Sequence, residues 1–106
     1  EAQRQRYQSL NPSRFGLRPN TAGTISELRV VIDLLQKGDQ IFRAVDTGAK
    51  CDLAIVKNAL LKLVEVKSAH YRPDGKVMFG KPVNNEFDYL ALCLPDQIIY
   101  QPPLTP

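Results

Sequence analysis

The sequence contains few cysteines, one histidine and no long apolar run, and each shortage excludes a class of protein. Two cysteines, Cys51 and Cys93, are too few for a disulfide scaffold, and both stand in apolar runs where a thiol acts as a small buried hydrophobe. With one histidine and no Cys-x-x-Cys pair, a zinc site is not expected. No apolar run approaches the roughly 18 residues of a membrane span, and no signal-peptide core follows the first residues. We therefore expect a reduced, cytoplasmic protein that does not enter the membrane.

What the chain does contain is the composition of an ordinary globular domain. Of its 106 residues, 43% are hydrophobic and 24% are charged, which argues against long-range disorder and provides for one modest core. The net charge of +3 permits a nucleic-acid partner but also occurs in many proteins without one. Residues 1–20 carry four arginines and are predicted to be either a plain linker or a basic arm that contacts phosphates. Residues 21–106 are predicted to form the domain.

One amphipathic helix is predicted to begin at Thr24 and to end at Gly38. Thr24 with Glu27 three residues later has the spacing of a capping box, and Gly38 suits the position after the last turn. On a helical wheel, the apolar residues fill one continuous arc: Ile25, Leu28, Val30, Val31, Ile32, Leu34 and Leu35. The opposite arc is polar: Ser26, Arg29, Asp33, Gln36 and Lys37. Glu27 falls inside the apolar arc, so it either caps the helix or aims a carboxylate into the sheet below.

Apolar and β-branched runs separated by turn residues predict a sheet. The expected strands cover residues 40–45, 50–56, 60–67, 68–72, 76–80, 88–94 and 98–100. The sequence Pro73-Asp74-Gly75 predicts the tight turn of the second hairpin. Several strands are apolar on both faces, so we expect the helix to cover one face and a partner or second layer to cover the other. The predicted fold class is α/β (α+β), with a mixed central β-sheet and an N-terminal helix packed on it.

A turn at Asn58 sets the register of the first long hairpin. Asn tolerates the left-handed conformation of a tight turn, and a two-residue loop beginning at Asn58 pairs Lys57 with Leu60. That register places Asp52 opposite Glu65. A four-residue loop would preserve the register, whereas a three-residue loop would break it. Directly opposed residues have Cβ atoms about 5 Å apart, so the two carboxylates repel each other unless a cation lies between them.

Glu65 and Lys67 alternate with valines, so they lie on one face of their strand. The plain interpretation of this pattern is an exposed strand edge with alternating charge. The functional interpretation is a Mg²⁺ site for phosphodiester cleavage, with Asp52 and Glu65 as metal ligands. The carbonyl of Val66 is a candidate third ligand, and Glu27 is a further ligand or an outer contact. Lys67 would orient the attacking water or stabilise the transition state.

Three segments together resemble the PD-(D/E)XK nuclease superfamily: Ser26-Glu27-Leu28, Cys51-Asp52-Leu53 and Val64-Glu65-Val66-Lys67-Ser68-Ala69. The chain is most similar to group I intron homing endonucleases of this fold and to archaeal Holliday-junction resolvases, and Gly48 and Phe87-Asp88-Tyr89 match further positions of those families. The resemblance implies a restriction-endonuclease-like core and Mg²⁺-dependent DNA cleavage, with Mn²⁺ able to replace Mg²⁺. It also implies three carboxylates around the metal, Glu27, Asp52 and Glu65, with Lys67 beside them. Because the span 80–87 is short, the second helix of this fold is expected to be short or absent.

Five residues are predicted to contact DNA. They are Arg29 on the helix and His70, Tyr71, Arg72 and Lys76 on the second hairpin, where basic and aromatic side chains suit the backbone and the bases. Equally, the hairpin residues fit an ordinary solvated surface. Because cutting both strands of a duplex requires two sites, we expect a homodimer or a higher homo-oligomer. The alternative to an endonuclease is a non-catalytic DNA-binding or assembly module that retains the nuclease fold.

Overall fold

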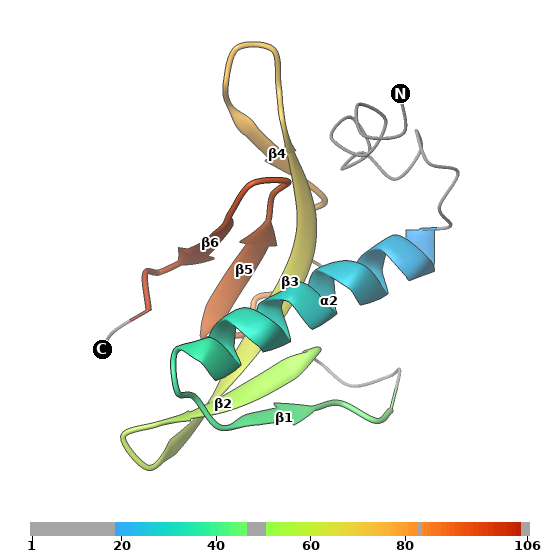
Figure 1. Cartoon of the computed structure of the whole chain (residues 1–106). Coiled ribbons are helices and arrows are strands. Elements are labelled where there is room, and N and C mark those ends of the chain that lie inside the picture. The colour runs from blue at the N-terminus through green and yellow to red at the C-terminus, as the bar shows by residue number, and fades with distance from the viewer. Residues whose placement is uncertain (1–18, 47–50, 83, 105–106) are drawn as a thin grey trace.

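The helix and the sheet form two layers, with α2 lying across one face of the sheet (Figure 1). The computed structural model describes residues 19–46, 51–82 and 84–104. Its elements are α2 (Pro19–Gln36), β1 (Ile41–Arg43), β2 (Leu53–Lys57), β3 (Leu60–Tyr71), β4 (Val77–Phe79), β5 (Tyr89–Cys93) and β6 (Ile98–Gln101). Apart from its last two residues, the arm or linker predicted for 1–20 lies outside the described residues, as does Gly48.

The sheet is mixed, as the sequence predicts. Its strands follow the order β1-β2-β3-β5-β6, and β4 pairs with the far end of β3. β3 and β5 run parallel, while the other pairs are antiparallel. The strands expected at 60–67 and 68–72 are one continuous strand, because β3 extends from the first hairpin into the second. Among the described residues, the connection from β4 to β5 contains no helix.

α2 begins earlier than its sequence predicts. Pro19 starts the first turn, where its fixed φ and missing N–H are tolerated. Thr24 lies inside the helix and its hydroxyl donates to the Asn20 carbonyl (2.9 Å), so the predicted capping box is wrong. The predicted end is confirmed, because Gly38 has a φ of 86° and closes the helix in a Schellman motif.

Among the described residues, no helix has both the length and the apolar character of a membrane-spanning segment.

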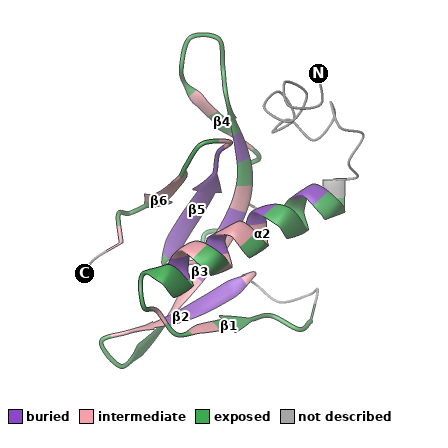
Figure 2. Cartoon of the chain, viewed as in Figure 1, coloured by how far each residue is buried: buried purple, intermediate pink, exposed green. Residues whose placement is uncertain are grey.

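α2 packs on the sheet through residues spaced four apart. Ala22, Ser26, Val30 and Leu34 are buried, and Figure 2 shows buried segments that alternate with exposed ones along the helix. Val30 and Leu34 join a main core with residues of three strands: Leu53, Ile55, Val64, Val66, Tyr89 and Ala91. The helix therefore contributes one row of side chains to the core.

The other half of the predicted apolar arc faces solvent. Ile25, Leu28, Ile32 and Leu35 are 41–56% exposed, and we call these four residues the outer stripe. Ser26, which the wheel assigns to the polar arc, is buried instead, and its hydroxyl lies 2.6 Å from that of Ser68 on β3. The apolar arc of the wheel therefore does not face the sheet as a whole, because a helix meets a neighbouring layer along a ridge of residues four apart. Two adjacent apolar strips look like one arc on a wheel.

The opposite face of the sheet carries a smaller core at one end. Its buried members and the side chains packed on them come from β3, β4, β5, β6 and the adjoining loops: Ala69, Leu90, Leu92 and Leu94, with Val77, Phe79, Phe87 and Ile99. At the other end of this face, Phe42 and Leu61 are 48% and 60% exposed. The cover expected from a partner or second layer is thus supplied in part by the chain's own hairpin.

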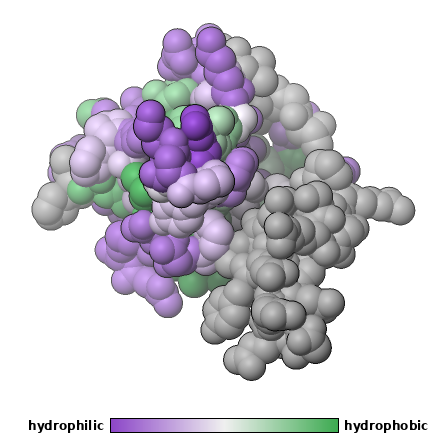
Figure 3. Space-filling view, turned by 90° about the horizontal axis from the view of Figure 1, so that it is seen from above, coloured by the Kyte–Doolittle hydropathy of each residue, from purple (hydrophilic) through white to green (hydrophobic). Residues whose placement is uncertain are grey.

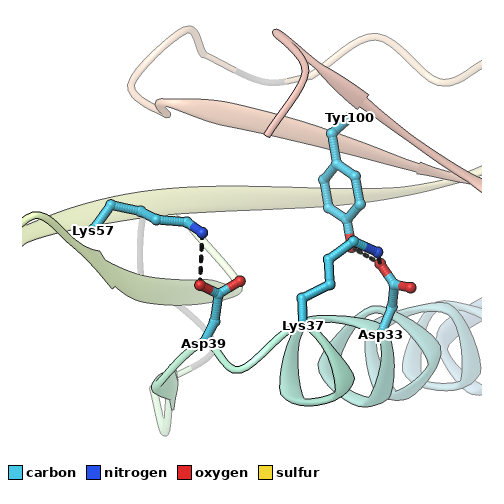
Figure 4. A network of polar contacts seen from close by, with 5 residues as sticks. All are labelled: Asp33, Lys37, Asp39, Lys57 and Tyr100. Carbon is cyan, nitrogen blue, oxygen red and sulfur yellow. Dashed lines mark hydrogen bonds and ion pairs between the residues drawn. The ribbon is translucent and has the colours of Figure 1, made fainter. Parts of the chain in front are cut away.

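Polar contacts fasten the C-terminal end of α2 to the sheet (Figure 4). The Tyr100 hydroxyl donates to Asp33 Oδ2 (2.6 Å), and Lys37 Nζ lies 2.6 Å from the same oxygen. After the helix, Lys57 and Asp39 form a 2.7 Å ion pair. Burial alone would raise the pKa of Asp33, but the hydrogen bonds from Lys37 and Tyr100 outweigh it and lower the pKa. These contacts hold α2 in one position over the sheet.

Candidate active site

β2 and β3 form the hairpin that the sequence predicts. Lys57 pairs with Leu60, which confirms the predicted register. Asn58 and the residue after it have φ values of 53° and 65°, so the loop is a two-residue turn of left-handed residues. Extending this register one pair beyond the first residue of β2 places Asp52 opposite Glu65. A local turn is therefore enough to bring two carboxylates together.

Asp52 and Glu65 lie close enough to share a hydrogen bond. The pKa of Glu65 is raised to about 7, chiefly by burial, then by the negative charge of Asp52 and by the hydrogen bond between the two side chains. Asp52 Oδ2 also accepts a hydrogen bond from the Val66 N–H (3.1 Å), which holds this carboxylate against β3. Two carboxylates that favour a shared proton in this way also favour a cation at the same position.

Lys67 completes the charged face of β3. It lies two residues after Glu65 and therefore on the same face, and its positive charge opposes the rise in the Glu65 pKa. The parallel partner β5 holds this part of the strand, because Glu65 pairs with Leu90 and Lys67 with Leu92. Val66 points into the main core and is 9% exposed. The two charged side chains are thus carried by a central strand rather than by a loop.

Glu27 reaches the same region from α2 but has a different partner. Its Oε1 lies 2.9 Å from both Nε and Nη2 of Arg43, a residue of β1. Glu27, Arg43 and Asp52 line one cleft of about 280 Å³. Among the described residues, no group of three or more His, Cys, Asp or Glu side chains is arranged to hold a metal ion. Of the three predicted carboxylates, the structure brings two together and pairs the third with an arginine.

Arg43 is a charged cleft residue that the sequence analysis did not indicate. It belongs to no motif, and β1 places it by pairing it with Leu53, the neighbour of Asp52. The segment that joins β1 to β2 is irregular over its described residues, so strand periodicity does not predict this pairing. The proximity of Arg43 to Asp52 is therefore a tertiary result.

Four of the five predicted DNA contacts lie on the β3–β4 hairpin. His70, Arg72 and Lys76 are exposed, and Arg72 forms an exposed 3.1 Å ion pair with Asp74 in the turn. The Gly75 φ of 87° confirms the tight turn predicted there. Figure 3 looks down on this end of the molecule and shows mainly hydrophilic surface over the hairpin. The hairpin is accessible, and its tip is polar.

The other two predicted DNA contacts, Tyr71 on the hairpin and Arg29 on α2, interact with other residues of the chain. The Tyr71 hydroxyl donates to Asp96 Oδ1 (2.8 Å) and accepts from Gln97 Nε2 (2.9 Å), which ties the hairpin to the β5–β6 turn. Arg29 is half-buried on α2 and lies near the Cys93 thiol. Burial raises the pKa of Cys93, and the charge of Arg29 opposes the rise. Arg29 is thus on α2, whereas the other four predicted contacts are on the β3–β4 hairpin.

Two further residues near the acidic pair have structural contacts. The Cys51 thiol donates to the Glu86 carbonyl (3.3 Å), and burial, followed by nearby carboxylates with Glu65 foremost, raises its pKa to about 11. This thiol is therefore protonated at neutral pH and unsuited to act as a nucleophile. Asp88 accepts a hydrogen bond from the Leu63 N–H (2.8 Å) and donates its own N–H to the Leu63 carbonyl (2.9 Å). Asp88 joins the start of β5 to β3.

Comparison with known proteins places the fold. No protein-family model matches the sequence, and no curated protein matches it significantly. Among solved structures, the chain is similar to a bacterial homing endonuclease, I-Ssp6803I, with a TM-score of 0.60 and 19% sequence identity. The alignment covers 71% of this chain and 56% of that chain. The helix and mixed sheet thus have the fold of a homing endonuclease, and at this identity the likeness shows the fold alone.

Proposed function

We propose that the chain is a metal-dependent DNA endonuclease of the PD-(D/E)XK type. Its activity would resemble that of homing endonucleases or junction resolvases. The observation that carries the proposal is the contact between Asp52, directly before β2, and Glu65 on β3, where burial and then the charge of Asp52 raise the pKa of Glu65. The similarity to the fold of a homing endonuclease supports the proposal.

Both Cys51 and Cys93 are free thiols, which fits the reducing cytoplasm that we propose as the location of the chain.

The donor set fits a magnesium ion. Mg²⁺ in phosphoryl-transfer sites is commonly held by one or two carboxylates together with waters and phosphate oxygens, and Asp52 and Glu65 supply two carboxylates. Val66 offers a carbonyl between Glu65 and Lys67. When bound, the metal supplies positive charge for the phosphoryl oxygens and favours deprotonation of a water. Manganese has similar ligand preferences and is expected to replace magnesium.

Lys67 supplies the positive charge of the chain itself at this face. Its position two residues after Glu65 directs the ammonium to the side of the strand that carries the carboxylates. There it holds the attacking water or stabilises negative charge that develops on the phosphate. The exposed hairpin with His70, Arg72 and Lys76 extends from the same strand, so we assign it to contacts with the DNA backbone.

Titration with Mn²⁺ tests this function without knowledge of the DNA target. We expect calorimetry to show heat of binding for the wild-type chain and none for Asp52→Asn. Because the pKa of Glu65 is raised to about 7, protons compete with the metal below that pH, so the affinity for Mn²⁺ should rise by about tenfold in total from pH 6 to pH 8 and level off above pH 7. In the absence of metal, the same raised pKa means that stability falls as pH increases from about 4.5 to about 7, and Glu65→Gln should remove this trend.

A non-catalytic DNA-binding module is the second candidate. The ion pair of Glu27 with Arg43 favours it, because it occupies one of the three carboxylates that the nuclease resemblance assigns to a metal. The same titration separates the two functions. If wild-type protein takes up no Mn²⁺ at pH 8, where Glu65 is ionised, the binding module is the better description.

A homodimer formed through the outer stripe supports cleavage of two strands. Ile25, Leu28, Ile32 and Leu35 follow the three-four-three spacing of a coiled-coil seam and are 41–56% exposed. Such a seam is complementary to itself in a twofold pair. The other exposed position of the last turn, Gln36, is uncharged, so like charges do not oppose pairing there. We therefore assign this surface to a second copy of the chain.

Ile32→Glu is expected to convert the dimer to a monomer, because it places a charge in the middle of the apolar seam. Sedimentation velocity across a range of protein concentrations measures the change, and circular dichroism shows whether the fold is kept. Gln36→Glu introduces the same charge on the same helix outside the stripe and should leave the dimer intact. A wild-type chain that is monomeric at every concentration would contradict this interface.

A further inference from the structure

The cleft beside Asp52 contains an unusual balance of charge. It is lined by one residue of α2 and by described residues at the end of β1, after it and before β2: Glu27, Arg43, Ala44, Val45, Asp46, Cys51 and Asp52. Three of these side chains are acidic and one is basic. A phosphodiester that approaches the cleft is repelled unless positive charge offsets the carboxylates. Of the lining residues that the structure describes, Arg43 is the one that supplies such charge.

The guanidinium of Arg43 is held on one side and accessible on the other. Its Nε and Nη2 both lie 2.9 Å from Glu27 Oε1. The Arg43 side chain is nevertheless 51% exposed, whereas that of Glu27 is 20% exposed. Arginine carries five N–H donors in a rigid fork that matches the oxygens of a phosphate, so donors remain after the contact with one carboxylate oxygen. Glu27 thus orients the fork and leaves donors for a ligand.

We propose that Arg43 binds a backbone phosphate of DNA next to the Asp52–Glu65 pair and that Glu27 positions the Arg43 guanidinium for this contact. The inference rests on the proposed nuclease function and adds a substrate contact to it. Glu27 then acts through Arg43, as a positioning residue, rather than on the metal. Because an exposed ion pair contributes little to stability, either residue can be replaced while the fold is kept.

Salt dependence of DNA binding measures a phosphate contact directly. The probe is a labelled duplex of mixed sequence, titrated by fluorescence anisotropy in EDTA over a series of NaCl concentrations. Each phosphate contact contributes about 0.9 to the slope of log affinity against log salt concentration. Arg43→Ala should therefore lower the slope by about 0.9 and weaken binding by about tenfold at low salt. A change in the slope is not expected if Arg43 has only a structural role.

Three matched variants complete the experiment. Arg43→Lys keeps the charge but loses the fork, so it should retain the wild-type slope with part of the affinity. Lys62→Ala removes a lysine of β3 that does not line the cleft, and it should bind as the wild type does. Glu27→Gln keeps the hydrogen-bond acceptor and removes the opposing charge. It should bind the duplex at least as tightly as wild type and should still take up Mn²⁺.

The outcomes separate this inference from the function on which it rests. If wild type binds the duplex and Arg43→Ala has the same slope and affinity, the Arg43 contact is wrong and the proposed nuclease stands. If Glu27→Gln abolishes Mn²⁺ binding, Glu27 is a metal ligand and its positioning role is wrong. If wild type binds the duplex at no salt concentration, the proposed function fails together with the inference. Should Arg43→Ala fail to fold, the Arg43→Lys slope and affinity still decide the matter.

Discussion

Lys67→Ala should reduce Mg²⁺-dependent DNA cleavage by about 10²- to 10³-fold while leaving the fold unchanged. The expected loss is that of one preorganised group that stabilises charge in a transition state. Lys67 lies on the carboxylate-bearing face of β3, and its charge already acts on the neighbouring Glu65. Because Lys67 is only half-buried, its removal should leave the unfolding free energy within about 1 kcal/mol of wild type.

Asp52→Asn should abolish the same activity through a different step. The amide keeps an oxygen that accepts a hydrogen bond from the Val66 N–H, but it removes the negative charge that helps to bind a cation. It also removes the repulsion that contributes to the high pKa of Glu65, so that pKa should fall from about 7. Activity and metal affinity should therefore be lost together, whereas Lys67→Ala should lose activity with Mn²⁺ binding retained.

Conversion of supercoiled plasmid to open circles, and cleavage of a labelled four-way junction, measure these effects in Mg²⁺ with EDTA as the blank. Lys62→Ala is the matched control for Lys67→Ala, because it removes a lysine from the same strand. Circular dichroism establishes that each variant is folded. Cleavage at the wild-type rate by both Lys67→Ala and Asp52→Asn would show that this site does not carry the reaction.

Leu34→Ala should lower the free energy of unfolding by about 2–5 kcal/mol, the range for removing a leucine side chain from a well-packed core. Leu34 is 0% exposed and belongs to the row of α2 residues that packs on the sheet. Its loss leaves a cavity between α2 and the strands against which Leu34 packs. Urea denaturation followed by circular dichroism measures the change.

Leu35→Ala is the control, because it makes the same chemical change one residue further along the same helix. Leu35 is 56% exposed, so its replacement should alter stability by less than about 1 kcal/mol at concentrations where the chain is monomeric. Equal losses for the two variants in the monomer would contradict the placement of the helix. A loss for Leu35→Ala that appears only at higher concentration would instead support the dimer at the outer stripe.

The sequence by itself determined the acidic pair. Alternation along a strand has a period of two, and a two-residue turn at Asn58 carries one register from the turn outward. Both are local properties, so Asp52 and Glu65 are brought together without reference to the rest of the fold. The turn at Pro73-Asp74-Gly75 and the end of α2 at Gly38 were predictable for the same reason. The similarity to the homing-endonuclease fold was likewise predicted from motifs on these elements.

Only the tertiary structure decided which side of α2 is buried and what Glu27 contacts. A helical wheel shows the direction of each side chain but not the position of the layer below, so it cannot divide two adjacent apolar strips. The sheet contacts the row that contains Ser26, Val30 and Leu34 and leaves the outer stripe in solvent. Arg43 reaches Glu27 because β1 pairs with β2 beneath α2, and no local pattern sets that arrangement. Local rules thus placed the two carboxylates and Lys67, whereas the position of Arg43 beside Asp52 depends on how distant segments pack.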